Sequence, residues 1–276
     1  MPVQRSNQPD AFLAFERANW NDVIGGYERL FAPLTAQTVE PLLSAAGVGT
    51  GKRVLDICTG HGVLAAAAKA RGVEASGLDF SAEAVSIARR NIPDAKFTEG
   101  DAQNLPYTSG SFDCVLCAYG LMHLPEPDRA LSEIFRVLTP GGRAAFSVWG
   151  KPAPGNGYGL MFGAIKQHGR LDVPLPDGPD FFQFSAPHAL PGILGEYGFH
   201  AVEVRTVPQF WEMPRPGDLL DAILDGAVRL RAVLKAQELD AFVSIRREVE
   251  EGIEMFRSGD LYRVPMPAIV AGGRKP

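Results

Sequence analysis

Short apolar runs alternate with amphipathic stretches between residues 52 and 149. The apolar runs predict strands at Arg53–Ile57, Glu74–Asp79, Lys96–Glu99, Asp113–Tyr119 and Arg143–Trp149. The stretches between them predict helices at Gly62–Arg71, from Ser81 to about Asn91, and at Pro127–Leu138, the last ended by Pro140–Gly142. Strands that alternate with helices in this way predict a parallel, doubly wound α/β sheet.

The flanking regions are more helical. Before about Gly47 the pattern predicts two amphipathic stretches, Phe12–Trp20 and Tyr27–Ala46. Beyond Trp149 it predicts helices near Leu160–His168 and Pro187–Tyr197, loops at Pro152–Gly159 and Asp172–Phe184, and strands at His200–Trp211 and Pro267–Gly272. A long helical segment lies between Pro214 and Gly259, with one apolar face formed by Phe242, Ile245, Val249, Ile253 and Phe256. We therefore expect N-terminal helices (1–46) that cover a site, a binding core (47–150), and a C-terminal part (151–276) whose insertion at about 214–259 forms a lid.

Charge and cysteine content narrow the class of protein. The 276 residues include 27 basic and 32 acidic side chains, a net charge of −5, so a nucleic-acid partner is not expected. No apolar run is long enough to span a membrane, and the opening residues do not resemble a secretion signal, which favours a soluble cytoplasmic protein. Cys114 and Cys117 are three apart in a predicted strand, so their thiols point to opposite faces and we expect both to be buried and inert.

The loop after the first predicted strand indicates the ligand. Gly60-x-Gly62-x-x-Ala65 satisfies the dinucleotide fingerprint, which on its own also fits a nicotinamide cofactor. Asp56, at the end of the strand, would repel a pyrophosphate placed against this loop. The same carboxylate would attract a ligand that carries an ammonium and a sulfonium. Asp56 therefore favours S-adenosylmethionine (SAM) over NAD.

Two further acids follow the next two predicted strands. Asp79 ends the second strand, where a carboxylate can accept both hydroxyls of a ribose, and this feature fits NAD equally well. Asp101 follows the third strand, where it could accept the amino group of an adenine. The carboxyl ends of parallel strands form one edge of the sheet, so we expect the three acids to line a single binding site.

The residues around these acids resemble the class I SAM-dependent methyltransferases, in the small-molecule branch that includes the ubiquinone and menaquinone biosynthesis enzymes. The resemblance extends over about residues 51–149. The segments that match are VLDICTGHG (54–62), GLDFS (77–81), GDAQNLPY (100–107), SFDCVL (111–116), HLPEP (123–127) and EIFRVLTPGG (133–142). It implies a Rossmann-like sheet of seven strands, the last antiparallel, with a final hairpin formed by His200–Trp211 and Pro267–Gly272.

The resemblance also implies which residues bind SAM. Asp56 and the Thr59–Gly62 loop, including Gly60 and His61, would hold the methionine moiety, and Asp79 the ribose. Phe80 would lie against the adenine, with Asp101, Ala102 and Gln103 at its edge. Ala118 and Tyr119 would lie near the methyl donor, and Tyr27 would close over the cofactor, although an aromatic residue there equally suits a packed helix.

The chain departs from the quinone C-methyltransferases at the position where they generally carry an Arg-Asn pair. Here the sequence reads Met122-His123, which argues against a quinone ring as the methyl acceptor. His123 is the candidate general base, and the alternative is a histidine packed under the loop. No spacing groups the histidines as metal ligands, so no metal is implied.

The sequence predicts a SAM-dependent methyltransferase acting on a small organic acceptor, hydrophobic or aromatic. The candidate lining of the acceptor pocket is Trp20, Met161, Phe162, Phe181, Phe182, Phe184, Phe210 and Trp211. The alternatives are a SAM-binding protein of the same fold without methyl transfer, or an NAD-dependent oxidoreductase. The partner is a small molecule, with neither nucleic acid nor membrane, and the chain is a monomer or a homodimer.

Overall fold

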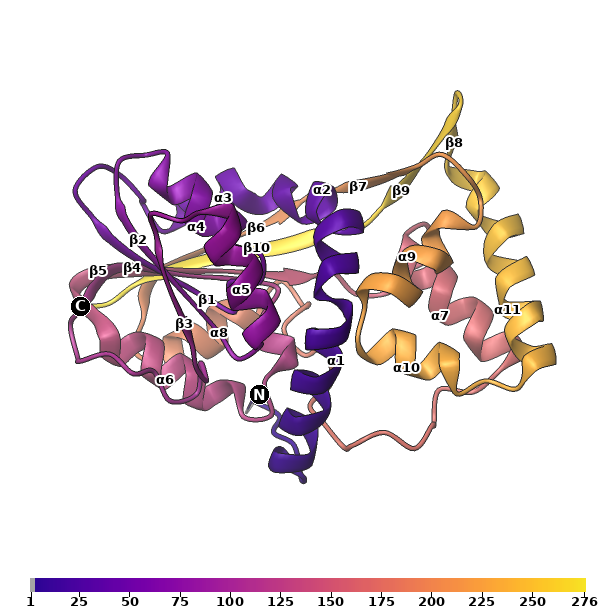
Figure 1. Ribbon diagram of the computed structural model, residues 1–276, viewed down its shortest axis with the longest axis horizontal. Helices are drawn as coiled ribbons and strands as arrows, with labels where there is room; N and C mark the ends of the chain where they lie inside the picture. Colours follow the sequence, from indigo (N-terminus) through magenta and orange to yellow (C-terminus); the bar gives the residue numbers. More distant parts are fainter. Residues whose placement is uncertain (1–2) are drawn as a thin grey trace.

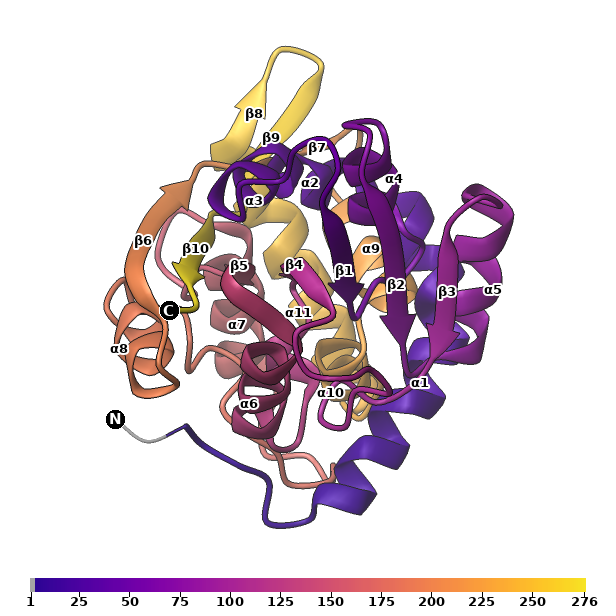
Figure 2. The same cartoon turned by 90° about the vertical axis from the view of Figure 1, so that its left-hand side faces the viewer.

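A seven-stranded sheet forms the centre of the computed structural model, which describes residues 3–276. Its strands are β1 (Arg53–Ile57), β2 (Glu74–Asp79), β3 (Lys96–Glu99), β4 (Phe112–Ala118), β5 (Leu138–Trp149), β6 (His200–Val207) and β10 (Ala268–Arg274). They lie side by side in the order β3-β2-β1-β4-β5-β10-β6, which Figure 2 shows from right to left. The first five strands pair in parallel, and β10 runs antiparallel to both β5 and β6. The predicted sheet, with its last strand antiparallel, is confirmed.

Helices cover both faces of this sheet. The first face carries α3 (Val39–Ala45), α4 (Val63–Lys69) and α5 (Ala82–Asn91), which share one apolar core cluster with the sheet. The second face carries α6 (Pro127–Val137) and α8 (Ala189–Glu196), which belong to the other large cluster. Cys114 lies in the first cluster and Cys117 in the second, so the two thiols are buried on opposite faces as expected.

The boundary between α6 and β5 differs from the prediction. The helix ends at Val137, and Pro140–Gly142 lies within the long strand β5 instead of ending the helix. Leu138 pairs with Phe112, after which the register shifts at a bulge before the regular pairing of Arg143 with Cys114. A bulge tolerates the proline because its residues do not need every backbone N–H for the ladder.

The N-terminal region forms one long helix where two separate stretches were predicted. Helix α1 (Pro9–Leu30) runs without a break through Gly25 and Gly26, and α2 (Ala32–Thr35) and the 3₁₀ turn η1 (Ala36–Thr38) follow it. A Cβ atom on Gly26 would lie 2.1 Å from the carbonyl oxygen of Asp225. The glycine is therefore explained by the close approach of another helix and not by a helix end.

The predicted strand His200–Trp211 is divided between two sheets. It stops at Val207, and β7 (Phe210–Met213) resumes beyond Pro208 in a three-stranded sheet of order β7-β9-β8. The other members of that sheet are β9 (Leu261–Pro265) and β8 (Arg257–Ser258), neither of which was predicted. Proline cannot donate a ladder hydrogen bond, which explains why the chain leaves the main sheet here.

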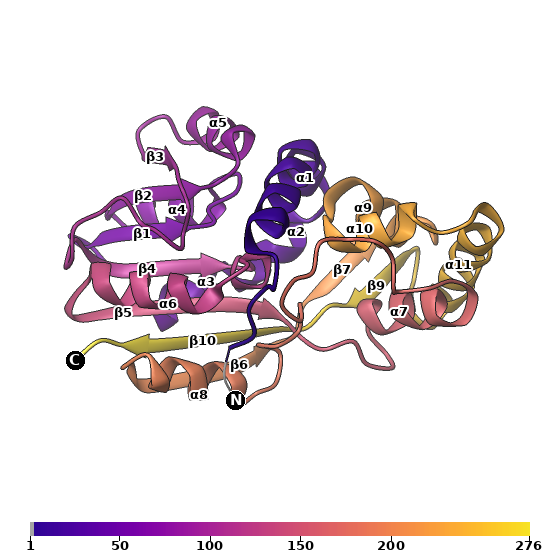
Figure 3. The same ribbon diagram turned by 90° about the horizontal axis from the view of Figure 1, so that it is seen from below.

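A helical lobe lies beyond the carboxyl edge of the main sheet, at the right of Figure 1. It consists of α7 (Gly157–His168), α9 (Asp218–Gly226), α10 (Arg229–Lys235), α11 (Leu239–Gly252) and the 3₁₀ turn η3 (Ile253–Phe256). Helix α1 runs between this lobe and the sheet, which Figures 1 and 3 both show. Across residues 3–276, none of the helices combines the length and the apolar character that a membrane crossing requires.

Candidate functional site

The loop between β1 and α4 holds an unusual backbone. Cys58, Gly60 and Gly62 all have positive φ angles, of 52°, 54° and 91°. A Cβ atom on Gly62 would lie 2.6 Å from the Ile92 side chain, so the position is confined as well as left-handed. The turn presents backbone atoms toward the edge of the sheet, which suits close approach by a ligand.

Asp56 is a buried carboxylate at the end of β1. The hydroxyl of Thr59 donates a 2.6 Å hydrogen bond to its Oδ2 atom. Burial raises the pKa of Asp56 from 3.8 to about 7, and repulsion from Asp79 adds to the effect of burial, whereas the bond from Thr59 opposes it. A bound cation would stabilise the ionised form of this carboxyl, because its opposite charge would replace the solvation that burial removes.

Asp79 joins the two loops at the ends of β1 and β2. The backbone N–H of Gly60 donates to its Oδ2 atom at 2.8 Å, and that of Ser81 donates to Oδ1 at 3.0 Å. Burial raises the pKa of Asp79, and these backbone hydrogen bonds partly offset that increase. Each oxygen keeps a second lone pair, so the carboxylate can still accept from the hydroxyls of a ligand.

Two small cavities, of about 40 and 60 Å³, lie along this edge of the sheet. The first is bounded by Asp56 and the second by Asp79, and Tyr27 lines both. The predicted cofactor-binding residues that line one or both are Tyr27, Asp56, Thr59, Gly60, His61, Asp79, Phe80, Ala118 and Tyr119. A ligand that spans both cavities must displace side chains at their shared wall, because the cavities are smaller than a nucleoside.

Four of the predicted residues line neither of these cavities. Gly62 lies behind the loop as the N-cap of α4, and Ala102 is buried in the core. Asp101 accepts hydrogen bonds from the backbone N–H and the side-chain amide of Gln103, at 2.8 and 3.1 Å. Gln103 in turn accepts from the backbone N–H of Glu126. The roles of these four residues in cofactor binding stay predictions.

His61 lies in the loop beside Tyr27. Its side chain is largely buried, and burial lowers its pKa, so the imidazole is neutral at pH 7. Its Nδ1 atom has no hydrogen-bond partner in the part of the chain that the structure describes. This orphaned polar atom and the buried Asp56 carboxyl line the same cavity, and an acceptor for an ammonium beside a ring nitrogen fits the polar groups of an amino-acid moiety.

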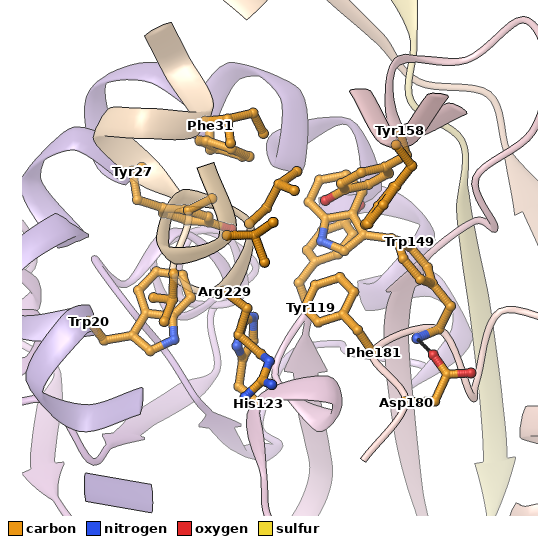
Figure 4. A pocket seen from close by; sticks show the side chains of 18 of the residues that line it. Trp20, Tyr27, Phe31, Tyr119, His123, Trp149, Tyr158, Asp180, Phe181 and Arg229 are labelled. Atoms are coloured by element: carbon orange, nitrogen blue, oxygen red, sulfur yellow. Dashed lines mark hydrogen bonds between the residues drawn. The ribbon is translucent and has the colours of Figure 1, made fainter. Parts of the chain in front are cut away.

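A larger cavity of about 280 Å³ lies between α1, the helical lobe and the loop that precedes α8. Aromatic side chains form much of its wall, as Figure 4 shows. They are Trp20, Tyr27, Phe31, Tyr119, Trp149, Tyr158, Phe162, Phe181 and Phe182. Tyr119 stacks on Trp149, with ring centroids 4.1 Å apart, and its hydroxyl donates to Gln209. We refer to this space as the aromatic cavity.

Half of the candidate acceptor-pocket residues line the aromatic cavity. Trp20, Phe162, Phe181 and Phe182 do so, whereas Met161 and Phe184 are packed in the core. Phe210 and Trp211 line a separate groove beside β7. Trp149 and Tyr158 also line this cavity and were not predicted, because a buried aromatic residue in a strand or helix has the same pattern whether it faces the core or a cavity.

His123 borders both the Asp79 cavity and the aromatic cavity. Its Nδ1 atom is 2.9 Å from the Oε2 atom of Glu16, a fully buried residue of α1. Glu16 was not among the predicted site residues. The sequence could have indicated that Glu16 is buried, because it lies four residues after Phe12 and four before Trp20, on the face of the helix that packs inward.

Comparisons with known proteins define the class. The family model "Methyltransferase domain" matches residues 55–146. The demethylmenaquinone methyltransferase of Thermus thermophilus is 34% identical over 166 residues, covering 54% of this chain and 74% of that protein. The chain belongs to the class I SAM-dependent methyltransferases, in the quinone-biosynthesis-like branch. It spans only about half the length of other relatives with the same description.

Solved structures agree on the fold. A Haemonchus contortus phosphoethanolamine N-methyltransferase 2 in complex with SAM superposes with a TM-score of 0.59 at 18% identity, covering 96% of this chain and 60% of that one. A chain described as the [4+2]-cyclase SpnF gives 0.53 at 22% identity, covering 87% and 81%. Identities this low support the fold alone.

The protein is thus an enzyme with SAM as its cofactor, and the NAD alternative is set aside. Over residues 3–276, the structure groups no three His, Cys, Asp and Glu side chains so that they could hold a metal ion.

Proposed function

We propose that the enzyme methylates a small, flat, apolar molecule held in the aromatic cavity. The observation behind this proposal is a shared wall. Trp20 and His123 border both the Asp79 cavity and the aromatic cavity, and Tyr27 and Tyr119 border these two and the Asp56 cavity. An acceptor in the aromatic cavity would therefore lie directly beside the cofactor, as an in-line displacement requires.

In this proposal the chain holds the cofactor through charge and hydrogen bonding. When bound, SAM supplies a methyl group on an electrophilic sulfonium. Asp56 would accept from the ammonium, and the backbone of Thr59–Gly62 would lie against the methionine moiety. Asp79 would accept from the ribose hydroxyls, beside Phe80. The cation at Asp56 would compensate the cost of ionising that buried carboxyl.

The helical lobe would act as the lid, together with α1. Ile223 and Gly226 of α9 and Arg229 and Leu230 of α10 line the aromatic cavity, opposite the residues of α1. A Cβ on Gly26 would meet the backbone of Asp225, so α1 and the lobe are in close contact beside the cavity. Closing these elements would exclude water from the reacting atoms.

Aromatic walls favour a planar acceptor, because such rings interact edge-to-face or offset with aromatic side chains. The names of the relatives would suggest a demethylated quinone. Met122-His123 stands where quinone C-methyltransferases generally carry Arg-Asn, so we propose an aromatic acceptor other than a quinone ring.

Isothermal calorimetry tests the cofactor site. We expect SAM and S-adenosylhomocysteine to bind wild type, and Asp79→Ala to weaken binding at least tenfold. The matched control is Asp260→Ala, which removes an exposed carboxylate from the β8–β9 turn. Unchanged binding by Asp79→Ala would reject the assigned site.

Mass spectrometry of small-molecule extracts incubated with isotope-labelled SAM tests the acceptor. We expect a labelled product that is aromatic. Intact SAM binding with no labelled product over a broad panel would instead favour a SAM-binding protein without methyl transfer.

A further inference from the structure

A buried glutamate, Glu16, pairs with the candidate base His123, whose ring lines the aromatic cavity. Glu16 has a solvent exposure of 0%, and its Oε2 atom lies 2.9 Å from His123 Nδ1. Its other oxygen, Oε1, has no hydrogen-bond partner within residues 3–276. A carboxylate in this position is costly unless it is paired, so its only described partner, the imidazole, determines what it can do.

The pair selects one form of the imidazole. When Glu16 is ionised, its carboxylate only accepts hydrogen bonds, and the shared proton then lies on the Nδ1 atom of His123. The lone pair of the neutral ring is then on Nε2, on the side away from Glu16. Within the described chain Nε2 makes no hydrogen bond, and the ring lines both the Asp79 cavity and the aromatic cavity. Nε2 is thus free to accept a proton there.

Aromatic neighbours hold the ring in place. Trp20 and Phe181 both contact His123 edge-to-face, with ring centroids 5.0 and 5.4 Å away. Figure 4 shows the imidazole at the floor of the cavity, below Trp20 and Tyr119. Besides Glu16 on α1, the charged groups around the same cavities are Asp79 at the end of β2, Asp180 in the loop before α8, and Arg229 of α10.

We propose that Glu16 is a positioning residue that holds His123 as a general base, and that the acceptor bears an aromatic or enolic hydroxyl group. This inference rests on the proposed function and specifies its acceptor class. The hydroxyl O–H bond breaks and its proton moves to Nε2, giving an imidazolium beside the Glu16 carboxylate. The acceptor oxygen forms a bond to the methyl carbon, while the carbon–sulfur bond breaks with its electron pair going to sulfur, which becomes a neutral thioether.

Steady-state kinetics with hydroxyl acceptors test both residues. We expect Glu16→Gln to lower kcat about a hundredfold while the KM for SAM stays within about twofold, because the amide can no longer enforce the tautomer. His123→Gln should lose about a hundredfold or more. The control is Asp10→Asn, which changes a carboxylate to an amide on the exposed face of the same helix and should match wild type.

The acidity of the acceptor distinguishes a base from a merely structural histidine. A nitrophenol that is already ionised at the assay pH has no proton to transfer. The loss in kcat for His123→Gln should therefore shrink from about a hundredfold with a simple phenol to less than about fivefold with the nitrophenol. An equal loss with both acceptors would overturn the role of His123.

Nitrogen-15 NMR of the histidine side chains gives a readout that is independent of activity. In the free protein we expect the His123 ring to be protonated on Nδ1, and in Glu16→Gln to be a mixture or protonated on Nε2. Retention of the wild-type tautomer and of wild-type kcat in Glu16→Gln would overturn the positioning role. Methylation of amines but of no hydroxyl compound would overturn the acceptor class, whereas failure of wild type to bind SAM would reject the proposed function itself.

Discussion

Asp56 should make SAM binding depend steeply on pH. The free protein holds this carboxyl with a pKa of about 7, because burial disfavours its charge, but the proposed contact with the ammonium of SAM requires the ionised form. Below that pH, binding must first remove a proton. The apparent Kd should therefore be about tenfold weaker at pH 6 than at pH 8, and about a hundredfold weaker at pH 5.

Calorimetry over pH 5–8.5 in buffers of different ionisation enthalpy measures the Kd for SAM and the number of protons released on binding. At pH 6 about one proton should be released for each SAM bound, and at pH 8.5 almost none. Asp56→Asn should bind SAM weakly at pH 8 but with little dependence on pH. Asp79→Asn should keep most of the pH dependence and serves as the control. A flat wild-type profile, or an unchanged slope in Asp56→Asn, would refute this reasoning.

The same carboxyl should make the free protein less stable as pH rises, whereas it makes SAM binding stronger. Between pH 4 and 7 the folded state binds a proton on Asp56 that the unfolded state has released, so the free energy of unfolding falls as pH rises through this window. Without SAM, Asp56→Asn should be more stable than wild type at pH 8, by the order of a few kcal/mol. The two should converge near pH 4, which thermal denaturation at both pH values can check.

Three substitutions test the packing around the site. Gly26→Ala should destabilise the fold by about 1–3 kcal/mol, because its Cβ would lie 2.1 Å from the backbone of Asp225. Gly25→Ala has open space and should instead stabilise α1 by roughly 0.5–1 kcal/mol, so denaturant titration should give opposite signs for the two. Tyr119→Phe should cost about 1–2 kcal/mol by leaving the buried amide oxygen of Gln209 unpaired, and equal stability to wild type would contradict that account.

The local pattern was sufficient for the first three strands and the helix α5, which build the carboxyl edge of the sheet around Asp56 and Asp79. The bounds of β1, β2 and β3 agree with the prediction at both ends, and Ser81 caps α5 by accepting from the backbone N–H of Ala84. These features depend on alternation and capping over a few residues, which the sequence contains directly. The acids Asp56 and Asp79 follow from the same strand ends.

Elements whose bounds depend on distant partners were predicted less well. The two stretches predicted at Phe12–Trp20 and Tyr27–Ala46 leave Gly26 between them, yet this glycine lies within α1 and permits contact with α9, almost 200 residues later in the chain. The end of β6 and the three-stranded sheet depend likewise on pairing between β7 and β9. Local propensity does not contain such contacts, and tertiary packing overrides it.

By itself, then, the sequence determined the α/β class, the edge of the sheet at which the acids lie, and the family. Short-range periodicity and a glycine loop with acids at fixed spacing are local properties, which is why the sequence contains them directly. Only the tertiary structure decided which aromatic side chains line one cavity and which group faces His123. Glu16 and His123 are separated by 107 positions, and an aromatic side chain lines a cavity or fills the core according to neighbours from other elements. Packing between distant segments sets both the Glu16–His123 pair and the lining of the cavity. The residues that determine this packing are distributed over the whole chain.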